Sequence, residues 1–238
     1  MLNAALLKQT VRENAVLWTV LTGVQCLMVF SVAMNAPIAA AGVAYYNLLP
    51  GIFAGIYAIT VGNRLICAKV DRGTLAYVLA TPVRRRAVTT TQAAFFGGSL
   101  LAMCALGAAA HCAGAALSSF GLTGADVRTV LELNLGLFLL GWAFAGICFA
   151  ASCVFNLTKH TIATGGGLVC AFLLLPIMAM FGQNYAFMRH LTIVSLYDVP
   201  AIMAHSAGWF WGLVALGMIG AAAGAAGSWA FTRRDLPL

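Results

Sequence analysis

Six apolar stretches run along the chain, separated by shorter segments that hold most of its charged residues. Each is long enough for a transmembrane helix, which needs about 20 residues. They cover residues 15–33, 46–62, 93–117, 133–155, 162–181 and 207–231. Backbone groups in lipid must pair within the protein, and a strand barrel would need short alternating segments, which the pattern lacks. We therefore predict an all-α integral membrane protein with six spans, forming a single domain over residues 1–238.

The positions of the charged residues indicate how the chain is oriented. Hydrophobic residues make up 62% of the sequence and charged residues 8%, whereas a soluble domain has roughly 25% charged residues. In a soluble protein the net charge of +7 would suggest nucleic acid, but in a membrane protein it is typical of loops at the cytoplasmic face. With both termini in the cytoplasm, the inner segments hold eleven of the 13 Lys and Arg residues. We therefore expect this orientation.

Two flanking segments have patterns of their own. Residues 1–14 place leucines near one side and basic residues near the other, which predicts a short interfacial helix; a frayed tail is the alternative. Residues 182–206 are too apolar for a solvated loop, and Asp198-Val199-Pro200 interrupts them. We expect an outer re-entrant helical hairpin there.

The inner segment of residues 64–92 is too structured for a simple connector. Asp71 can cap a short helix over residues 73–80, on which Leu75, Val78 and Leu79 form an apolar stripe. Thr81 and Pro82 then end this helix and start the next. The triple arginine of residues 84–86 follows at the membrane surface, where it could anchor lipid headgroups. The short helix could also present its apolar face to a soluble partner.

Within this segment the chain reads Asp71-Arg72-Gly73-Thr74-Leu75, then Val78-Leu79-Ala80-Thr81-Pro82-Val83, then Arg84-Arg85-Arg86. This order resembles the cytoplasmic loop of the type-2 ABC exporter permeases, which carries the coupling helix that docks on the nucleotide-binding subunit. The six-span layout, the amphipathic start and residues 231–236 extend the resemblance to essentially the whole chain. Two positions depart from the family pattern. Lys69 stands where the family often has an acidic residue, and Thr91-Gln92 stands where Gly-Lys often closes the loop.

The resemblance implies a permease subunit of an ATP-driven exporter in a bacterial plasma membrane. The chain has no G-x-x-x-x-G-K-[ST] phosphate-binding loop, so ATP would be hydrolysed on a separate polypeptide. We expect two ABC ATPase subunits carrying ATP and Mg²⁺, a second permease that is identical or homologous, contact with membrane lipid, no nucleic acid and no cofactor in this chain. The ATPase-docking residues would be Asp71, Arg72, Gly73, Thr74, Leu75, Val78, Leu79, Arg84, Arg85 and Arg86.

Residues within the spans are candidates for a substrate path, because polar groups in lipid are costly and usually face protein or water. We assign to it Gln25, Asn47, Gly51, Phe53, Gly55 and Tyr57. Gly51 and Gly55 form a GxxxG pair, which suits close packing within one subunit or at a dimer interface. The path is mostly apolar, which favours a hydrophobic or amphipathic substrate.

Other classes of protein fit the sequence less well. Nearly all of the seven cysteines lie in spans, and His111-Cys112 lacks any partner at metal-ligand spacing, so we expect no metal site. A secondary transporter would show internal repeats and intramembrane charges, and a membrane hydrolase would need a poised nucleophile or metal. An accessory subunit that docks an ATPase without transporting remains an alternative.

Overall fold

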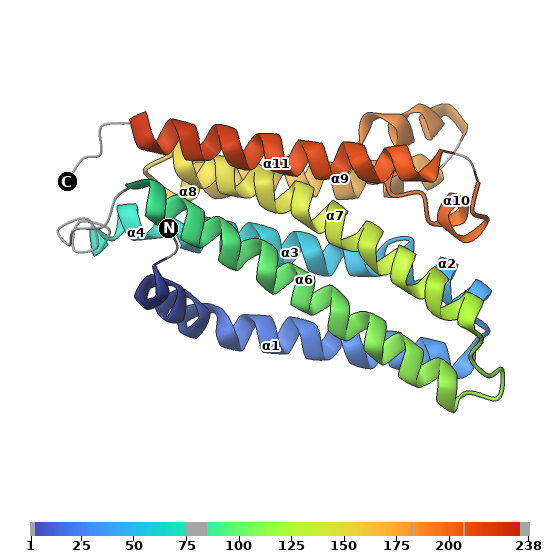
Figure 1. Cartoon of the computed structure of the whole chain (residues 1–238). Coiled ribbons are helices and arrows are strands. Elements are labelled where there is room, and N and C mark those ends of the chain that lie inside the picture. Colours follow the sequence, from blue (N-terminus) through green and yellow to red (C-terminus); the bar gives the residue numbers. More distant parts are fainter. Residues whose placement is uncertain (1–2, 75–84, 182, 207, 234–238) are drawn as a thin grey trace.

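The computed structural model describes residues 3–74, 85–181, 183–206 and 208–233, and within these ranges it contains helices and no strand (Figure 1). Six helical segments are long and apolar enough to cross a membrane. These confirm the six predicted spans. The predicted helix over residues 73–80 lies mostly outside the described residues, as do positions 182 and 207.

Each span is built from one helix or from consecutive short ones. Their bounds are α1 Ala4–Asn35; α2 Ile38–Tyr46, α3 Leu49–Leu65 and α4 Cys67–Asp71; α6 Arg85–Leu117; α7 Gly124–Val154; α8 Thr158–Thr161, the π-helix η1 Ile162–Gly166 and α9 Gly167–Met178; and α11 Trp209–Arg233. In Figure 1 the starts of α1 and α6, the end of α11 and both α4 and α8 lie at one end of the bundle, while α2 and α10 lie at the other. This arrangement fits spans that cross in alternating directions.

Local sequence signals define several helix ends. The Asn3 side chain caps α1 by accepting a hydrogen bond from the Leu6 amide at 3.1 Å. At the start of α7, Thr123 and Asp126 form a capping box, in which each side chain accepts from the backbone amide of the other residue. The helix α1 is continuous from Ala4, although its first turns are seen almost end-on in Figure 1 while the rest lies along the bundle. The segment predicted as an interfacial helix is thus continuous with the first span, and its position at the membrane surface stays a prediction.

The second span differs from the prediction at its outer end. We placed it at residues 46–62, but a further helix, α2, precedes α3 with a turn at Asn47 and Leu48 between them. Pro50 lies in the first turn of α3, where its missing amide donor is tolerated. The α2 residues are nearly all small or apolar, so no polar residue in the sequence marked this helix as separate from its surroundings.

The outer segment between α9 and α11 consists of short helical pieces. These are the 3-10 helices η2 Ala179–Phe181, η3 Gln183–Leu191 and η4 Ile193–Leu196, and the helix α10 Val199–Met203. Asp198 caps α10 by accepting from the Ala201 amide at 3.3 Å, and Pro200 occupies its first turn. The buried Tyr197 donates a hydrogen bond to the Leu133 carbonyl at 3.0 Å, which fastens the segment to α7. Whether it enters the membrane as a re-entrant hairpin stays a prediction.

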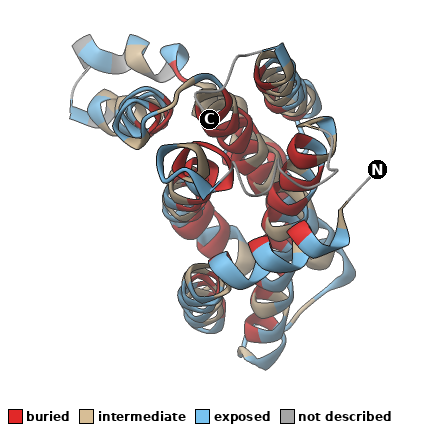
Figure 2. Cartoon of the chain, turned by 90° about the vertical axis from the view of Figure 1, so that its left-hand side faces the viewer, coloured by how far each residue is buried: buried red, intermediate tan, exposed pale blue. Residues whose placement is uncertain are grey.

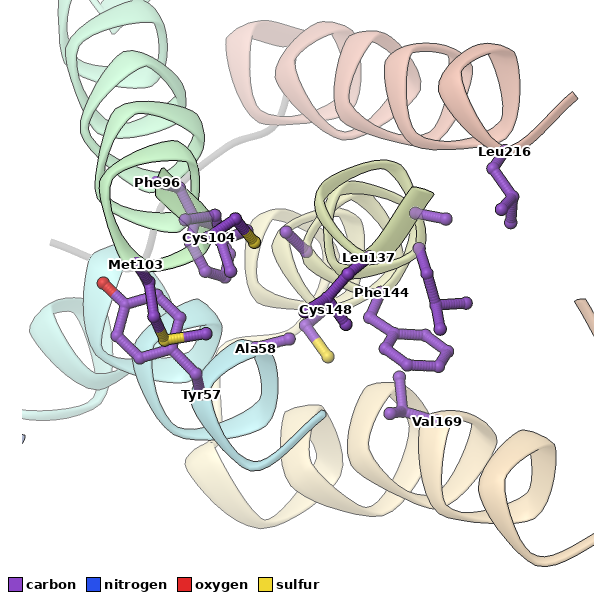
Figure 3. Packing of buried hydrophobic residues seen from close by; sticks show 14 of the residues in the cluster. Tyr57, Ala58, Phe96, Met103, Cys104, Leu137, Phe144, Cys148, Val169 and Leu216 are labelled. Atoms are coloured by element: carbon purple, nitrogen blue, oxygen red, sulfur yellow. The ribbon is translucent and has the colours of Figure 1, made fainter. Parts of the chain in front are cut away.

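The core is centred on α7, which packs against α3, α6 and α11. Figure 3 shows Leu137, Phe144 and Cys148 of α7 surrounded by side chains of the neighbouring helices, including Tyr57 and Val169. Seen from the end where α1 begins, buried residues face the middle of the bundle and exposed residues form its outside (Figure 2). Because lipid is itself apolar, close packing of this kind holds helices together in a membrane rather than the exclusion of water.

Candidate functional site

The end of the bundle that carries α4 and α8 holds the described part of the predicted ATPase-docking segment. Asp71 ends α4, and Arg72, Gly73 and Thr74 follow it as exposed residues. Gly73 has a φ of +69°, a conformation that favours glycine, so it turns the chain away from α4. Arg85 and Arg86 begin α6 at the same end. The remaining docking residues, Leu75, Val78, Leu79 and Arg84, lie outside the described residues.

The beginning of this segment is tied to the helices around it. The Asp71 carboxylate accepts a hydrogen bond from the Thr158 amide at 3.2 Å, which links the end of α4 to the start of α8. The Cys67 amide donates to the Ser152 hydroxyl at 2.9 Å, which links the start of α4 to α7. The segment therefore leaves the bundle from a short helix that is held at both ends.

A third link joins α4 to the first turns of α1. The Lys69 ammonium lies 3.1 Å from the Glu13 carboxylate. The Lys69 side chain is 12% exposed and that of Glu13 is 39% exposed, so the ion pair is only partly screened by solvent. Glu13 also accepts a hydrogen bond from Gln9 at 2.8 Å. Lys69 stands where the family often has an acidic residue, and Glu13 provides the negative charge that pairs with it.

Two hydrogen bonds fasten the beginning of α1 to the beginning of α6. The Asn3 amide donates to the Thr91 hydroxyl at 3.0 Å, and the buried Thr10 hydroxyl donates to the Gln92 side-chain carbonyl at 3.2 Å. Thr91 and Gln92 form the second place, after Lys69, at which the chain departs from the family pattern. Here they serve as contacts for the first turns of α1, and both are buried.

The residues assigned to a substrate path do not converge on one channel within the chain. Gly51 lies against both α7 and α9, and a Cβ atom on Gly55 would lie 2.8 Å from the Leu173 side chain of α9. The GxxxG pair therefore packs within the subunit. Tyr57 is buried and donates to the Ser99 hydroxyl of α6 at 2.7 Å, whereas Phe53 is half-buried.

Asn47 has a different environment from the other assigned residues. It is exposed at the end of the bundle that carries α2 and α10. There it lines a cavity of about 320 Å³, together with residues of α9 and of the segment between α9 and α11 that include Pro176, Tyr197 and Pro200. This cavity lies between the second span and the segment that we predicted to form an outer hairpin.

A buried polar cluster lies nearer the end of the bundle that carries α2 and α10. Asn134 of α7 donates to the Tyr46 hydroxyl at 2.7 Å, and this hydroxyl lies 3.0 Å from Nδ1 of His111. Which of Tyr46 and His111 donates depends on the imidazole tautomer, and Nε2 of His111 has no hydrogen-bond partner among the described residues. The sequence singles out His111 and Asn134 as polar residues within spans, but nothing in it shows that Tyr46 joins them.

Gln25 adjoins this cluster from α1. Its main-chain carbonyl accepts from the Tyr45 hydroxyl at 3.2 Å, and its amide nitrogen would lie 3.2 Å from a Cβ atom placed on Gly107 of α6. Gln25 is 1% exposed. It therefore contributes to helix packing inside this subunit, and its side-chain carbonyl accepts no hydrogen bond from the described residues.

The candidate residues described above make packing contacts, hydrogen bonds and ion pairs. Among the described residues, no three His, Cys, Asp or Glu side chains come together as metal ligands would. Of the ion pairs between described residues, one links α1 to α4 and the other two meet at Glu132, near the outer end of α7.

Comparison with known proteins decides which class of membrane protein this bundle represents. Residues 39–236 match the profile of the ABC-2 family transporter proteins. The chain belongs to that family. This ABC-2 protein is thus a multi-pass membrane permease of an ABC transporter, a transport component that is distinct from the P-loop ATPase. Membrane components of the ABC-2 family typically work with an ATPase subunit. Among curated proteins, none matches the chain.

Proposed function

We propose that this ABC-2 permease exports a hydrophobic or amphipathic substrate, driven by ATP hydrolysed on two separate nucleotide-binding subunits. The observation that carries the proposal is the placement of residues 71–74 and of Arg85 and Arg86 at one end of the bundle, on either side of the segment predicted to form the coupling helix. A soluble subunit docked there would contact the part of the chain that is richest in basic residues.

The contacts of α4 support a mechanism by which docking moves the spans. A force on residues 71–74 reaches α8 through Asp71, α7 through Cys67 and α1 through Lys69. Three helices would therefore respond to movement of one short helix. Such coupling requires elements with two discrete arrangements rather than contacts alone, and the bent beginning of α1 is our candidate for that element.

The substrate path would lie between this chain and a second permease subunit. The spans containing α1, α9 and α11 are the least enclosed within the bundle, and α1 exposes Val16 and Leu27 while α9 exposes Leu168 and Leu174. All six Asp and Glu residues lie outside the middle of the spans. An apolar path of this kind favours a substrate that leaves water readily. Asn47 would lie at its outer mouth.

The docking proposal is tested by exchanging Leu75 and Leu79 together for Glu. We expect this variant to insert into the membrane normally but to lose its ATPase partner, because charged side chains would replace the apolar stripe of the coupling helix. The measurement is the amount of P-loop ATPase that copurifies with the tagged permease from its native membrane.

The matched control is Val11→Glu, which adds a charge at an exposed apolar position of α1 at the same end of the bundle. It should retain the ATPase. Unchanged association in the Leu75 and Leu79 variant would place the docking site elsewhere. If the wild-type permease purifies without any ATPase, the proposed function itself is wrong.

A further inference from the structure

The end of α11 and the beginning of α6 together line an open basic pocket of about 460 Å³. This volume lies within the range of small-molecule sites, which is roughly 300–1,000 Å³. Its described lining residues are Arg85, Arg86, Trp229, Thr232 and Arg233. Three guanidinium groups thus come from two helices that are far apart in the sequence but in contact in the bundle.

The positively charged side chains of this pocket favour the binding of an anion. No carboxylate belongs to the described lining, and no described Asp or Glu forms an ion pair with Arg86 or Arg233. Guanidinium groups bind phosphate through two parallel hydrogen bonds, a geometry that a carboxylate or phosphate can match and water cannot. Thr232 adds a hydroxyl to the same lining.

The aromatic residue of the pocket places it at the membrane surface. The Trp229 ring is 59% exposed, and the Arg233 guanidinium lies over it, 4.4 Å from the ring centre. Tryptophan is enriched where the hydrocarbon core meets the headgroups, because its ring is apolar and its N–H is polar. From Trp229 toward the middle of the span, α11 exposes the alanines at 225 and 226. An acyl chain lying along this face would meet no polar side chain at these positions.

We propose that this pocket binds the headgroup of an anionic phospholipid. The phosphate would be held by Arg86 and Arg233, with Trp229 beside the glycerol and the acyl chains along α11. Charge complementarity argues for an anion, and the position at the end of two spans argues for a lipid rather than a soluble phosphate. Bound in this way, the lipid would join α6 to α11 at the inner end of the bundle. The proposal assigns Arg86, one of the predicted ATPase-docking residues, to lipid instead, and lipid binding is measured without the ATPase.

The test is native mass spectrometry of the detergent-purified permease with dioleoylphosphatidylglycerol, compared with dioleoylphosphatidylcholine. We expect the double variant Arg86→Gln/Arg233→Gln to bind phosphatidylglycerol at least about tenfold more weakly than the wild type, because it loses both charge-assisted contacts. The matched control, Lys8→Gln/Arg12→Gln, removes two exposed basic residues at the start of α1. It should bind like the wild type. Equal losses in the two variants would mean general attraction to a basic surface and would overturn the proposal.

Two further measurements locate the lipid and exclude a soluble anion. Brominated phosphatidylglycerol should quench the fluorescence of the wild type more than that of Trp229→Phe, since bromine quenches only a nearby indole; equal quenching would place the lipid elsewhere. Excess glycerol phosphate should leave bound phosphatidylglycerol in place. If it displaces the lipid completely, the pocket is a site for soluble phosphate and the lipid proposal is wrong.

Discussion

At Gly220 the main chains of α7 and α11 come into contact. A Cβ atom on Gly220 would lie 2.7 Å from the Trp142 carbonyl oxygen, and one on Gly146 would meet the Gly220 carbonyl. Trp142 also fills the space beside Gly97 of α6. Its indole therefore packs against a glycine on each of two helices, Gly97 of α6 and Gly220 of α11. Small residues of this kind let helix backbones approach in lipid.

Replacing Gly220 with Ala should therefore destabilise the fold. The added methyl group meets main-chain atoms that cannot rotate away, and overpacking of this kind costs about 1–3 kcal/mol. The control is Gly224→Ala, one turn along the same helix, where a Cβ atom meets nothing within 4 Å. This change should be neutral or slightly stabilising, because Ala favours helix over Gly by up to about 1 kcal/mol.

The measurement can use the chain's own thiols. The thiols of four cysteines, Cys67, Cys104, Cys148 and Cys153, are buried, so a thiol-reactive dye reports unfolding in detergent as the temperature rises. Gly220→Ala should melt below the wild type. If it melts at or above Gly224→Ala, the contact between α7 and α11 is looser than described.

At the scale of elements, α4 is the point at which three neighbouring helices meet the predicted coupling segment. Its ion pair with α1 is a contact that the sequence alone could not predict. The pattern shows that Lys69 departs from the family, but no periodicity links it to Glu13 in a different helix. The ion pair becomes visible only in the folded structure, where the beginning of α1 lies beside α4.

Reversing either charge alone, by Glu13→Lys or Lys69→Glu, should weaken the attachment of α1 to α4. A partly exposed pair contributes up to about 1 kcal/mol, so we expect a small drop in melting temperature that shrinks in high salt. The double reversal should recover most of it. Arg12→Glu serves as the control, since Arg12 is exposed and forms no ion pair with any described residue. A double variant as unstable as the single ones would contradict the pairing.

At the scale of the whole molecule, the six spans could be predicted because long apolar stretches are a strong signal. The details within them could not. The length and apolar character of the stretches predict neither the π-helix at Ile162–Gly166 nor the break before α3. The assigned path residues Gly51 and Gly55 show the same limit: the GxxxG spacing indicates close packing, and only the structure shows that the neighbour is Leu173.

The orientation of the bundle is open to a direct test with single cysteines in a cysteine-free background. Ser119→Cys lies at an exposed position between α6 and α7, and Thr74→Cys lies at the opposite end. We expect a membrane-impermeant maleimide to label Ser119→Cys in intact cells and Thr74→Cys only after permeabilisation, because basic segments stay in the cytoplasm. The reverse pattern would put residues 71–74 outside the cell, where no cytoplasmic ATPase could reach them.

The central position of α7 has a consequence for biosynthesis. Chains are made from the N-terminus, so α1, α3 and α6 are synthesised before the helix against which α3 and α6 pack. Tyr46 and His111 are then already in place, while Asn134, which bonds to Tyr46, is still to come. A polar group that lacks a hydrogen-bond partner in lipid raises the free energy of the inserted chain. The fourth span thus supplies the partner that relieves this cost, and α11, which packs against the other side of α7, is made only after it.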